Sequence, residues 1–387
     1  MIRFLTAGES HGKCLAGILE GMPAGLAVSE AEIAFDLQRR QHGYGRGERM
    51  KIEQDRARIL SGVRYGMTLG SPIALMIENR DWPNWRGVMN VESVEERRQS
   101  TPLTTPRPGH ADFAGALKYR HKDIRNVIER SSARETAMRV ALGAICRRFF
   151  AEIGVTAASH VVSIGTAHAA MDVATTPIED LNRRADASPV RCLDGAAEQE
   201  MITVIDEATT AHDSVGGIFE VIVSGLPAGI GSYAHPDRRL NAILAAALMT
   251  IPAIKSVAFG MGAEAARHFG SEVHDRMFAE GDGVRRTSNR SGGIEGGMST
   301  GEPVVMRAAM KPLSTLSQPL ETVDLATGKD AVALRERSDV CAVPAASVVA
   351  EAVVMLALMN PFLEKTGGDS MTEIQAHLAA TPPPSWA

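Results

Sequence analysis

The sequence predicts an α+β protein, and three observations support that class. A hairpin pattern opens the chain, apolar residues recur at helical spacing in several segments, and β-branched residues cluster between turn signals elsewhere. The 387 residues are 44% hydrophobic and 22% charged, which is typical of globular proteins and excludes disordered and fibrous classes. A chain of this length buries about three quarters of its unfolded surface, so its core needs no disulfide or metal.

The first elements expected are two short strands at residues 1–7 and 14–19, joined by the glycine-flanked turn 8–12. Ser29 and Glu32 form a capping-box pair, so a helix is expected over residues 30–40. Further strands are expected where β-branched residues cluster, at residues 155–164, 201–205, 219–223 and 303–308.

Three later segments predict helices. Residues 136–152 place apolar side chains on one helical face, with Gly154 as the expected C-cap. A second helix is expected over residues 240–250, because Pro252 follows it. The apolar run 342–359 contains a proline and a glutamate and is too short for a clean membrane span, so it predicts a core helix.

The domain organisation is expected to be simple: one domain over residues 1–380 and a flexible proline-rich tail at 381–387. Residues 21–26 (GMPAGL) and 225–230 (GLPAGI) share a pattern between an expected strand and an expected helix. This echo favours an internal pseudo-repeat of two related halves packed as one unit, and shared turn chemistry is the alternative.

Charge and cysteine usage limit the partners. The formal net charge of −5 argues against general binding of nucleic acid or anionic membranes, so any basic site is local. No secretory signal is present, and a reduced, cytoplasmic protein without a disulfide or metal framework is expected. The four scattered cysteines are Cys14, Cys146, Cys192 and Cys341.

The turn 8–12 reads GESHG and formally matches the GxSxG pattern of serine hydrolases. That nucleophile elbow normally follows several strands, whereas this turn comes after seven residues. The favoured interpretation is a tight turn between strands that presents Ser10 and His11 to a site.

A basic segment follows the first predicted helix. Helix C-termini favour cations, which explains Arg39 and Arg40 as a solvated helix end. It does not explain why Arg46 and Arg49 continue into the glycine-rich stretch 43–47. Guanidinium groups in such a loop are suited to phosphate or carboxylate oxygens, so an anion site is favoured here.

Three further motifs carry polar chemistry. In 105–112, proline and glycine fix the backbone around Arg107 and His110, which suits a general acid, and loop rigidity alone is the alternative. The RSSARE stretch at 130–135 opens a helix and is suited to phosphate, although a plain serine cap would look the same. Asp339 precedes the 342–359 helix and is either a base or a structural N-cap.

Taken together, these motifs resemble the chorismate synthase family. The resemblance is carried by GESHG at 8–12, SSARETA at 131–137 and RSDVCAVP at 337–344, and it spans nearly the whole chain in order. Further similar stretches are 40–50, 107–112, 289–297 and 310–315. The resemblance implies a β-α-β sandwich, in which a helical core is flanked by antiparallel sheets, and a homotetramer.

The resemblance also implies the reaction: a 1,4-anti elimination of phosphate from 5-enolpyruvylshikimate 3-phosphate that gives chorismate and requires reduced FMN. The substrate carries a phosphate and two carboxylates, so its site must gather arginines in a chain that is acidic overall. No flavin-reductase domain is visible, so an external flavin reductase is expected, with NADPH as a candidate reductant. The long segments 81–111 and 281–301 are expected to order on ligand binding.

By the same resemblance, His11 would protonate the departing phosphate, His110 would lie beside the flavin, and Asp339, assisted by Ser10 and Ser132, would help the flavin accept the substrate proton. The implied substrate-binding residues are Arg49, Arg107 and Arg134. The implied cofactor-binding residues are Arg40 and Arg46 (for NADP), Arg130, Ser131, Ser132, Pro252, Ala253, Gly296, Lys311, Pro312, Leu313, Ser314, Thr315 and Arg337. Two departures from the family pattern, Pro252 and a glutamate, Glu129, in place of a common glycine, put individual flavin contacts in doubt.

Overall fold

The computed structural model describes residues 1–47, 54–93, 95, 100–170, 177–281, 283–336 and 338–380. Two of the predicted site residues, Arg49 and Arg337, lie outside these ranges, as does the predicted tail 381–387. Helices and antiparallel sheets are both present, in agreement with the α+β prediction.

The first sheet has the strand order β1-β2-β6-β3, with every neighbouring pair antiparallel. Buried and more exposed residues alternate along its central strands, so one face is apolar: Leu15 and Leu19 of β2 pair with Ile77 and Ile73 of β6, and all four are buried. Its strands are β1 (Arg3–Ala7), β2 (Cys14–Glu20), β3 (Ala57–Ile59) and β6 (Ile73–Glu78).

The second sheet has the order β10-β15-β9-β7-β8 and is also antiparallel. Three of its strands were expected from the sequence, namely those near 155–164, 219–223 and 303–308. Its strands are β7 (Thr156–Ile164), β8 (Ala167–His168), β9 (Gly217–Ser224), β10 (Ile254–Phe259) and β15 (Val304–Met310).

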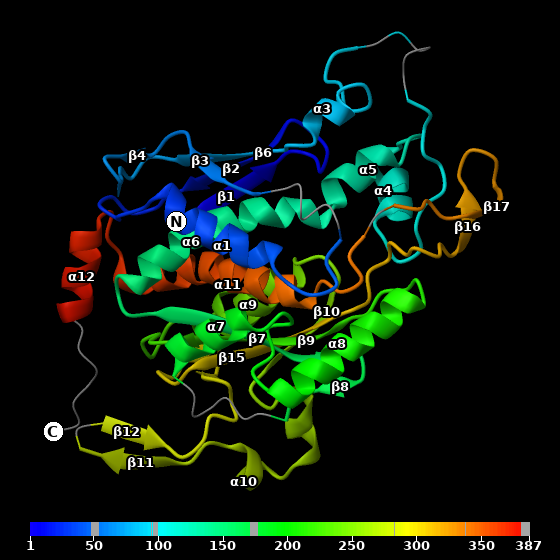
Figure 1. Ribbon diagram of the computed structural model, residues 1–387. Helices are drawn as coiled ribbons and strands as arrows, with labels where there is room; N and C mark the ends of the chain where they lie inside the picture. The colour runs from blue at the N-terminus through cyan, green and yellow to red at the C-terminus, as the bar shows by residue number, and fades with distance from the viewer. Residues whose placement is uncertain are drawn as a thin grey trace.

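A helical layer lies between the two sheets (Figure 1). The four predicted helices are all present, and the capping box of Ser29 and Glu32 begins the first of them. The layer is closely packed, because a Cβ placed on Gly143 would lie 2.5 Å from the Cβ of Ala352. These helices are α1 (Glu30–Gln41), α6 (Thr136–Ala151), α9 (Leu240–Met249) and α11 (Val343–Thr366).

Helix α11 contains the apolar run that could be mistaken for a membrane span. By length and composition it could cross a membrane, but 83% of its most apolar window is buried inside the protein. It contacts α1, α6, α9, β7 and β9, so it is a core helix, as expected.

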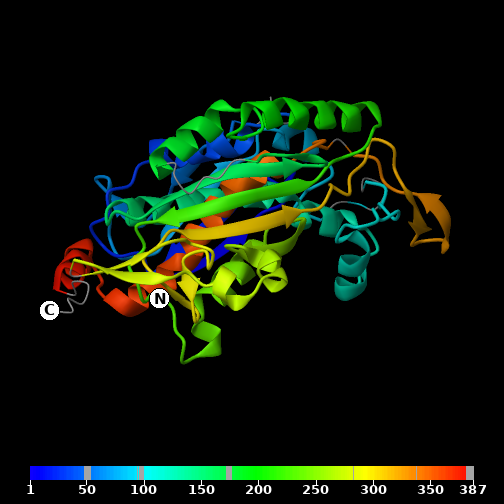
Figure 2. The same ribbon diagram turned by 90° about the horizontal axis from the view of Figure 1, so that it is seen from below.

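The expected strand at 201–205 is wrong, because these residues lie within helix α8 (Gly195–Thr210). Asp194 caps this helix by accepting hydrogen bonds from the N–H groups of Ala196 and Ala197. The buried side chains, Ala197, Met201 and Ile205, recur every four residues, which is helical spacing. Of the β-branched residues between them, Ile202 and Val204 are half-buried and Thr203 is exposed, and this local cluster led to the strand assignment. Figure 2 shows α8 along one edge of the second sheet.

Two smaller expectations also need correction. Helix α6 has its C-cap at Glu152, and the predicted cap Gly154 lies two residues further on, where its φ of 77° turns the chain. The segments 81–111 and 281–301, expected as long loops, contain short elements of their own: α3 (Trp82–Trp85), β12 (Gly283–Arg286), β13 (Ile294–Glu295) and β14 (Met298–Ser299).

The other elements lie around this sandwich (Figure 1). They are β4 (Val63–Arg64), β5 (Met67–Thr68), α4 (Asp112–Tyr119), α5 (Arg125–Ser131), the 3-10 helices η2 (Ala133–Glu135), η3 (Pro236–Arg238) and η4 (Gly262–Arg267), α7 (Ile178–Ala187), α10 (Gly270–Val273), β11 (Met277–Glu280), β16 (Glu321–Asp324), β17 (Lys329–Val332) and α12 (Met371–Ala380).

The GMPAGL and GLPAGI segments each follow a strand, β2 and β9, and each precede a helix, α1 and α9. Each segment also forms the same pair of hydrogen bonds with one side-chain hydroxyl. The Thr68 hydroxyl donates to Pro23 O at 2.6 Å and accepts from Leu26 N at 2.9 Å. The Ser299 hydroxyl repeats both bonds, at the same two distances, with the corresponding residues of GLPAGI.

Candidate active site

The turn 8–12 joins β1 to β2 and packs against the end of α5. The Ser10 N–H donates to Glu129 O at 2.9 Å, and the Ser132 hydroxyl donates to the Ser10 hydroxyl at 3.2 Å. Arg130 donates to the carbonyl oxygens of Gly8 and Thr6 at 3.0 and 2.8 Å. The turn 8–12 and the stretch 130–135, about 120 residues apart in the sequence, are therefore in contact, and the hydrogen bonds of Arg130 hold them together.

The GxSxG match does not mark a hydrolase elbow, because the turn connects two antiparallel strands and no helix follows it. Ser132 does act as a cap: its hydroxyl accepts from the N–H of Arg134 at the start of η2. The plain-cap interpretation of the RSSARE stretch thus holds for one hydroxyl, while the contact with Ser10 goes beyond it.

His11 is held by three contacts. Its Nδ1 lies 2.9 Å from Glu129 Oε1, its backbone N–H donates to Glu129 Oε2 at 2.7 Å, and its ring stacks on Trp85 with centroids 3.8 Å apart. The Glu129 side chain is 1% exposed and that of His11 is 18% exposed. The carboxylate is therefore buried behind a ring that still reaches solvent.

Arg40 and Arg134 converge on a buried carboxylate, Asp55. Arg134 donates to Asp55 Oδ1 at 2.5 Å and to Asn79 Oδ1 at 2.9 Å. Arg40 donates to Thr136 Oγ1 and to a backbone carbonyl, and its Nη1 lies 3.6 Å from Asp55 Oδ2. Both Nη1 and Oδ2 are buried and form no hydrogen bond with any residue in the described ranges. The ion pair with Asp55 therefore leaves Arg40 Nη1 without a hydrogen-bond acceptor.

Burial lowers the pKa of Arg40 to about 10, and the positive charges of Arg46 and Arg134 act in the same direction against the opposing Asp55. The expectation that Arg39 and Arg40 form a solvated helix end is wrong, because both side chains are buried. Gathering like charges away from water is unfavourable unless anions neutralise them, so the electrostatics favour a bound polyanion.

Asp339 faces the glycine-rich loop that follows α1. Its Oδ2 lies 3.1 Å from Arg46 Nη1, and its Oδ1 accepts from the N–H of Gly47 at 2.7 Å. The N-cap interpretation of Asp339 is wrong, since the cap position of α11 is Ala342, without a side-chain hydrogen bond. Gly45 has a φ of 77°, and a Cβ there would lie 2.9 Å from Ile205, so only glycine fits this approach.

The contacts above define the Ser10 cluster: Ser10, His11, Arg40, Arg46, Asp55, Glu129, Ser132, Arg134 and Asp339.

A second group surrounds His110. Asp112 is buried and accepts from His110 Nδ1 at 2.5 Å and from Arg107 Nε at 2.8 Å. Arg107 also donates to Thr315 at 2.8 Å and to Glu336 at 3.1 Å, so its nitrogens already have protein partners. We call Arg107, His110, Asp112, Lys311, Ser314, Thr315 and Glu336 the His110 cluster.

The loop 311–315 supplies the cationic part of this second group. A Cβ placed on Gly109 would lie 3.6 Å from both Lys311 Nζ and Ser314 Cβ, so the two loops are adjacent. Burial and the charge of Lys255 lower the pKa of Lys311. The Lys311 N–H donates to Ala253 O at 3.0 Å, which brings the predicted 252–253 turn to the same loop.

One short stretch of chain connects the two clusters. Glu336 contacts Arg107, and three residues later Asp339 contacts Arg46. The predicted residues Arg337 and Arg49 both lie outside the described ranges.

Not every predicted residue joins these clusters. Gly296 lies between β13 and β14, and none of the described contacts connects it to either cluster. The Ser131 hydroxyl donates to Val127 O within its own helix. Pro312 and Leu313 belong to the 311–315 loop, where Leu313 O accepts from the Ser214 hydroxyl.

The sequence analysis missed four residues that the structure places at the site: Asp55, Trp85, Asp112 and Glu129 as a partner of His11. Asp112 ends the motif that contains His110, so its position two residues away was an available signal. Glu129 was noted only as a departure from the family pattern. Nothing in the sequence pointed to Asp55, whose partners lie at residues 40 and 134.

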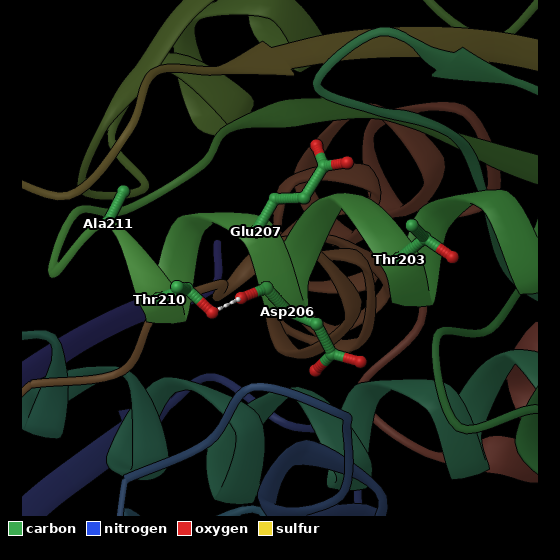
Figure 3. Close-up of a pocket in the computed structure, with 5 residues that line it drawn as sticks. All are labelled: Thr203, Asp206, Glu207, Thr210 and Ala211. Carbon is green, nitrogen blue, oxygen red and sulfur yellow. Dashed lines mark hydrogen bonds between the residues drawn. The ribbon is translucent and has the colours of Figure 1, made fainter.

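A shallow pocket elsewhere, on the surface of α8, does not suit a polyanion. Figure 3 shows its lining residues, all on one helix and including two carboxylates, Asp206 and Glu207. Asp206 accepts a hydrogen bond from the Tyr44 hydroxyl at 2.9 Å. The described lining contains no cation, so this pocket is not the candidate site.

Comparisons with known proteins agree on one family. A model of the chorismate synthase family matches residues 2–363. The chain is 53% identical over 381 residues to chorismate synthase of Bacillus pumilus (strain SAFR-032) and 52% identical over 381 residues to that of Bacillus subtilis (strain 168), covering 97% of each chain in both cases. A solved structure described as a crystal structure of chorismate synthase is 42% identical, has a TM-score of 0.79, and is matched over 98% of this chain and 96% of its own.

Proposed function

Because the chain belongs to the chorismate synthase family, we propose that its Ser10 and His110 clusters form a single active site that works with reduced FMN. The chain is a carbon–oxygen lyase that converts 5-enolpyruvylshikimate 3-phosphate into chorismate and phosphate. The family uses a reduced flavin; FMN as that flavin, the residues that bind it and the residues that act on the substrate are our proposal.

The buried Nη1 of Arg40 is the observation that carries this site. It lies among Arg46, Arg134 and Asp55 without a hydrogen bond to the described protein, in a chain whose net charge is −5. A phosphate or carboxylate oxygen would supply the missing acceptor and neutralise the neighbouring cations. Each charge-assisted hydrogen bond of this kind contributes about 1.5–3 kcal/mol.

We assign the anionic groups of the substrate to Arg40, Arg46 and Arg134, joined by Arg49 from the adjoining loop. Arg107 has a different part, since its contacts with Asp112, Thr315 and Glu336 use its donors within the protein. It acts by holding His110 and the 311–315 loop in place, so the earlier assignment of Arg107 to direct substrate binding is the weaker proposal.

The residues around the 311–315 loop fit an anionic flavin. Lys311 and the hydroxyls of Ser314 and Thr315 would hold its phosphate and polar edge, with the 252–253 turn beside them. The side chains of Arg130, Ser131 and Ser132 form hydrogen bonds within the protein. We therefore propose that these residues shape the flavin site. Arg337 and Gly296 complete the proposed set, and NADPH is proposed as a reductant that Arg40 and Arg46 recognise.

The proposed chemistry divides the work between cofactor and protein. Reduced FMN, when bound, supplies the electron that weakens the allylic C–O bond. His11 gives a proton to the phosphate as it leaves, and His110, fixed by Asp112, stabilises the charge beside the flavin. Asp339, with Ser10 and Ser132, would help the flavin accept the substrate proton.

We further propose that residues 1–380 form one domain, a sandwich of two related halves, which assembles as a homotetramer in the cytoplasm. We propose an external flavin reductase as the source of the reduced flavin. The matching hydrogen bonds of Thr68 and Ser299 support a common origin of the halves.

An anaerobic assay tests the proposed function. Enzyme, substrate and photoreduced FMN are mixed without oxygen, and phosphate release is followed for the parent chain and for Arg40→Met. We expect release only with reduced FMN, and a KM raised by about 10- to 100-fold in the variant, the equivalent of one lost charge-assisted hydrogen bond.

Arg238→Met is the matched control, because Arg238 forms an exposed ion pair with Glu364. Its KM should equal that of the parent chain. Phosphate release with oxidised FMN would contradict the cofactor proposal, whereas an unchanged KM in Arg40→Met would contradict the anion site alone.

A further inference from the structure

We propose that Glu129 is a positioning residue for His11: its buried carboxylate holds the ring with the proton on Nδ1 and leaves Nε2 as the atom that delivers a proton to the departing phosphate. The inference rests on the proposed role of His11 as the general acid. It extends that role by naming a residue that touches neither substrate nor flavin.

The geometry fixes the ring at one edge and one face and also fixes the backbone that carries it. Glu129 Oε2 accepts from the backbone N–H of His11 at 2.7 Å, and Oε1 lies 2.9 Å from Nδ1 of the same residue. Trp85 stacks on the ring with an interplanar angle of 21°, and the Ser10 N–H is tied to the backbone carbonyl of Glu129. Both carboxylate oxygens therefore serve one histidine, while none of the described residues bonds Nε2.

A carboxylate can only accept hydrogen bonds, so the ring nitrogen that faces it must carry hydrogen. The neutral ring of His11 is thereby set as the Nδ1–H tautomer, as in the histidine–aspartate pair of serine proteases. When Nε2 is also protonated, the positive ring faces the negative carboxylate. As the C–O bond breaks, the Nε2–H bond breaks and an O–H bond forms on phosphate, and the neutral ring keeps its Nδ1 proton.

The nearby charged side chain of Arg125 does not form a hydrogen bond with Glu129, so it does not compete with His11 for the carboxylate. Arg125 Nη1 is at 4.0 Å, beyond hydrogen-bond distance, and its guanidinium lies over Trp85. Asp112, by contrast, shares its carboxylate between His110 and two nitrogens of Arg107. A glycine at position 129 would remove the acceptor, so chains with glycine there must orient this histidine by other means.

The test uses Glu129→Ala and Glu129→Gln, with Glu220→Gln as the matched control. Glu220 is also a buried glutamate paired with a histidine, His160, at 3.3 Å, and it accepts from Arg307 Nε at 2.6 Å. None of these three residues belongs to either cluster, so Glu220→Gln reports what neutralising a buried, ion-paired glutamate does to the fold. Melting midpoints of all variants are recorded.

The first readout needs neither flavin nor substrate. The protein is labelled with 15N-histidine, the His11 signals are assigned with His11→Asn, and the ring nitrogens are examined at a pH where the imidazole is neutral. We expect the Nδ1–H tautomer in the parent chain and in Glu220→Gln, and the Nε2–H tautomer in Glu129→Ala. Glu129→Gln, whose amide oxygen can still accept, should keep Nδ1–H.

The second readout is anaerobic turnover with reduced FMN. Because the lost group acts on a general acid, kcat should fall by about 10²-fold in Glu129→Ala and by about 10-fold in Glu129→Gln, with KM nearly unchanged. Glu220→Gln should keep the parent kcat.

An unchanged tautomer, or a parent-like kcat, in Glu129→Ala overturns the proposal. The proposal would also be overturned if Glu129→Ala raised KM and if Glu129→Ala and Glu220→Gln lowered the melting midpoint equally. That result would indicate a structural role for Glu129. If the parent chain released no phosphate, the proposed function would be contradicted. The tautomer measurement would still test whether Glu129 orients the ring of His11.

Discussion

At the scale of single residues, the two clusters show two uses of a buried guanidinium. Arg107 donates hydrogen bonds to Asp112, Thr315 and Glu336, and these bonds fix the loop that carries His110. Arg40 keeps Nη1 without a hydrogen bond to the described chain and has its pKa lowered to about 10 by burial. The first arrangement holds the loop of His110 in place, and the second is consistent with our proposal that Arg40 binds an anion.

Asp112 yields a prediction with a defined pH dependence. Burial acts to raise the pKa of this carboxyl, but hydrogen bonds from His110 and Arg107 outweigh burial and hold the pKa well below its usual range. A carboxyl whose pKa is lower in the folded state stabilises the protein above its unfolded pKa of about 4, and this stability is lost as the pH falls further.

We therefore expect Asp112→Asn to lower the free energy of unfolding at neutral pH, with a gap to the parent chain that narrows progressively below about pH 4. Urea titrations of both proteins at about pH 6, 4 and 3 measure this gap. A gap that stays constant or widens on acidification would show that the ionised form of Asp112 is not what stabilises the fold.

At the scale of elements, the apolar helix α11 carries one buried charge that ties it to its neighbours. Glu351 accepts from Arg39 Nη1 and Nη2 at 2.8 and 2.9 Å and from the Ser159 hydroxyl at 2.6 Å, with Arg191 at 3.3 Å. Burial acts to raise the pKa of Glu351, but the two arginines outweigh it and the pKa lies below its usual value. The carboxylate thus joins α1 and β7 to α11.

Glu351→Gln should destabilise the protein, because it removes a buried carboxylate that pairs with two buried guanidinium groups. Arg39 and Arg191 keep a partner in Asp186, so the loss should lie at the lower end of the range for a buried ion pair. Breaking a buried ion pair by removing one partner costs about 3–5 kcal/mol. Chemical denaturation measures this loss. Glu364→Gln, which removes an exposed ion pair with Arg238, is the control and should change the free energy of unfolding by about 0.5 kcal/mol or less.

Elements with strong local signals could be predicted from the sequence. The capping box of Ser29 and Glu32 identified the start of α1, and clusters of β-branched residues identified β7, β9 and β15. Residues 201–205 were misassigned because local β-branched residues outweighed a four-residue burial period that only the packed structure makes plain. At the site, the arginines were predictable from their motifs, whereas Asp55 was not, because its partners approach it only through folding.

At the scale of the whole molecule, the two halves that we propose to be related share one pair of buried hydroxyl contacts. In each half a side-chain hydroxyl, of Thr68 or Ser299, bridges a carbonyl and an N–H of the Gly-x-Pro-Ala-Gly segment. Both residues are buried, so water cannot replace these bonds. The contribution of these hydroxyl contacts to stability can therefore be measured and compared between the two segments.

Thr68→Val and Ser299→Ala should therefore destabilise the protein to a similar extent, by about 1–3 kcal/mol each, since each leaves two backbone groups without a partner. Urea titrations of the two variants and of Thr210→Ala provide the comparison. The Thr210 hydroxyl bonds the preceding turn of an exposed helix face, so its loss should change stability by about 0.5 kcal/mol or less. A cost found in only one half would argue against equivalent roles.

The position of α11 within the chain bears on how the protein is made. This helix contacts α1, α6 and α9 and lies under β7 and β9, yet it begins only at Val343. Until these residues have been synthesised, β7, β9 and α9 lack this packing partner, whereas α1 and α6 can already cover the first sheet. We expect the second sheet to expose apolar surface to chaperones and to neighbouring chains until this late segment folds against it.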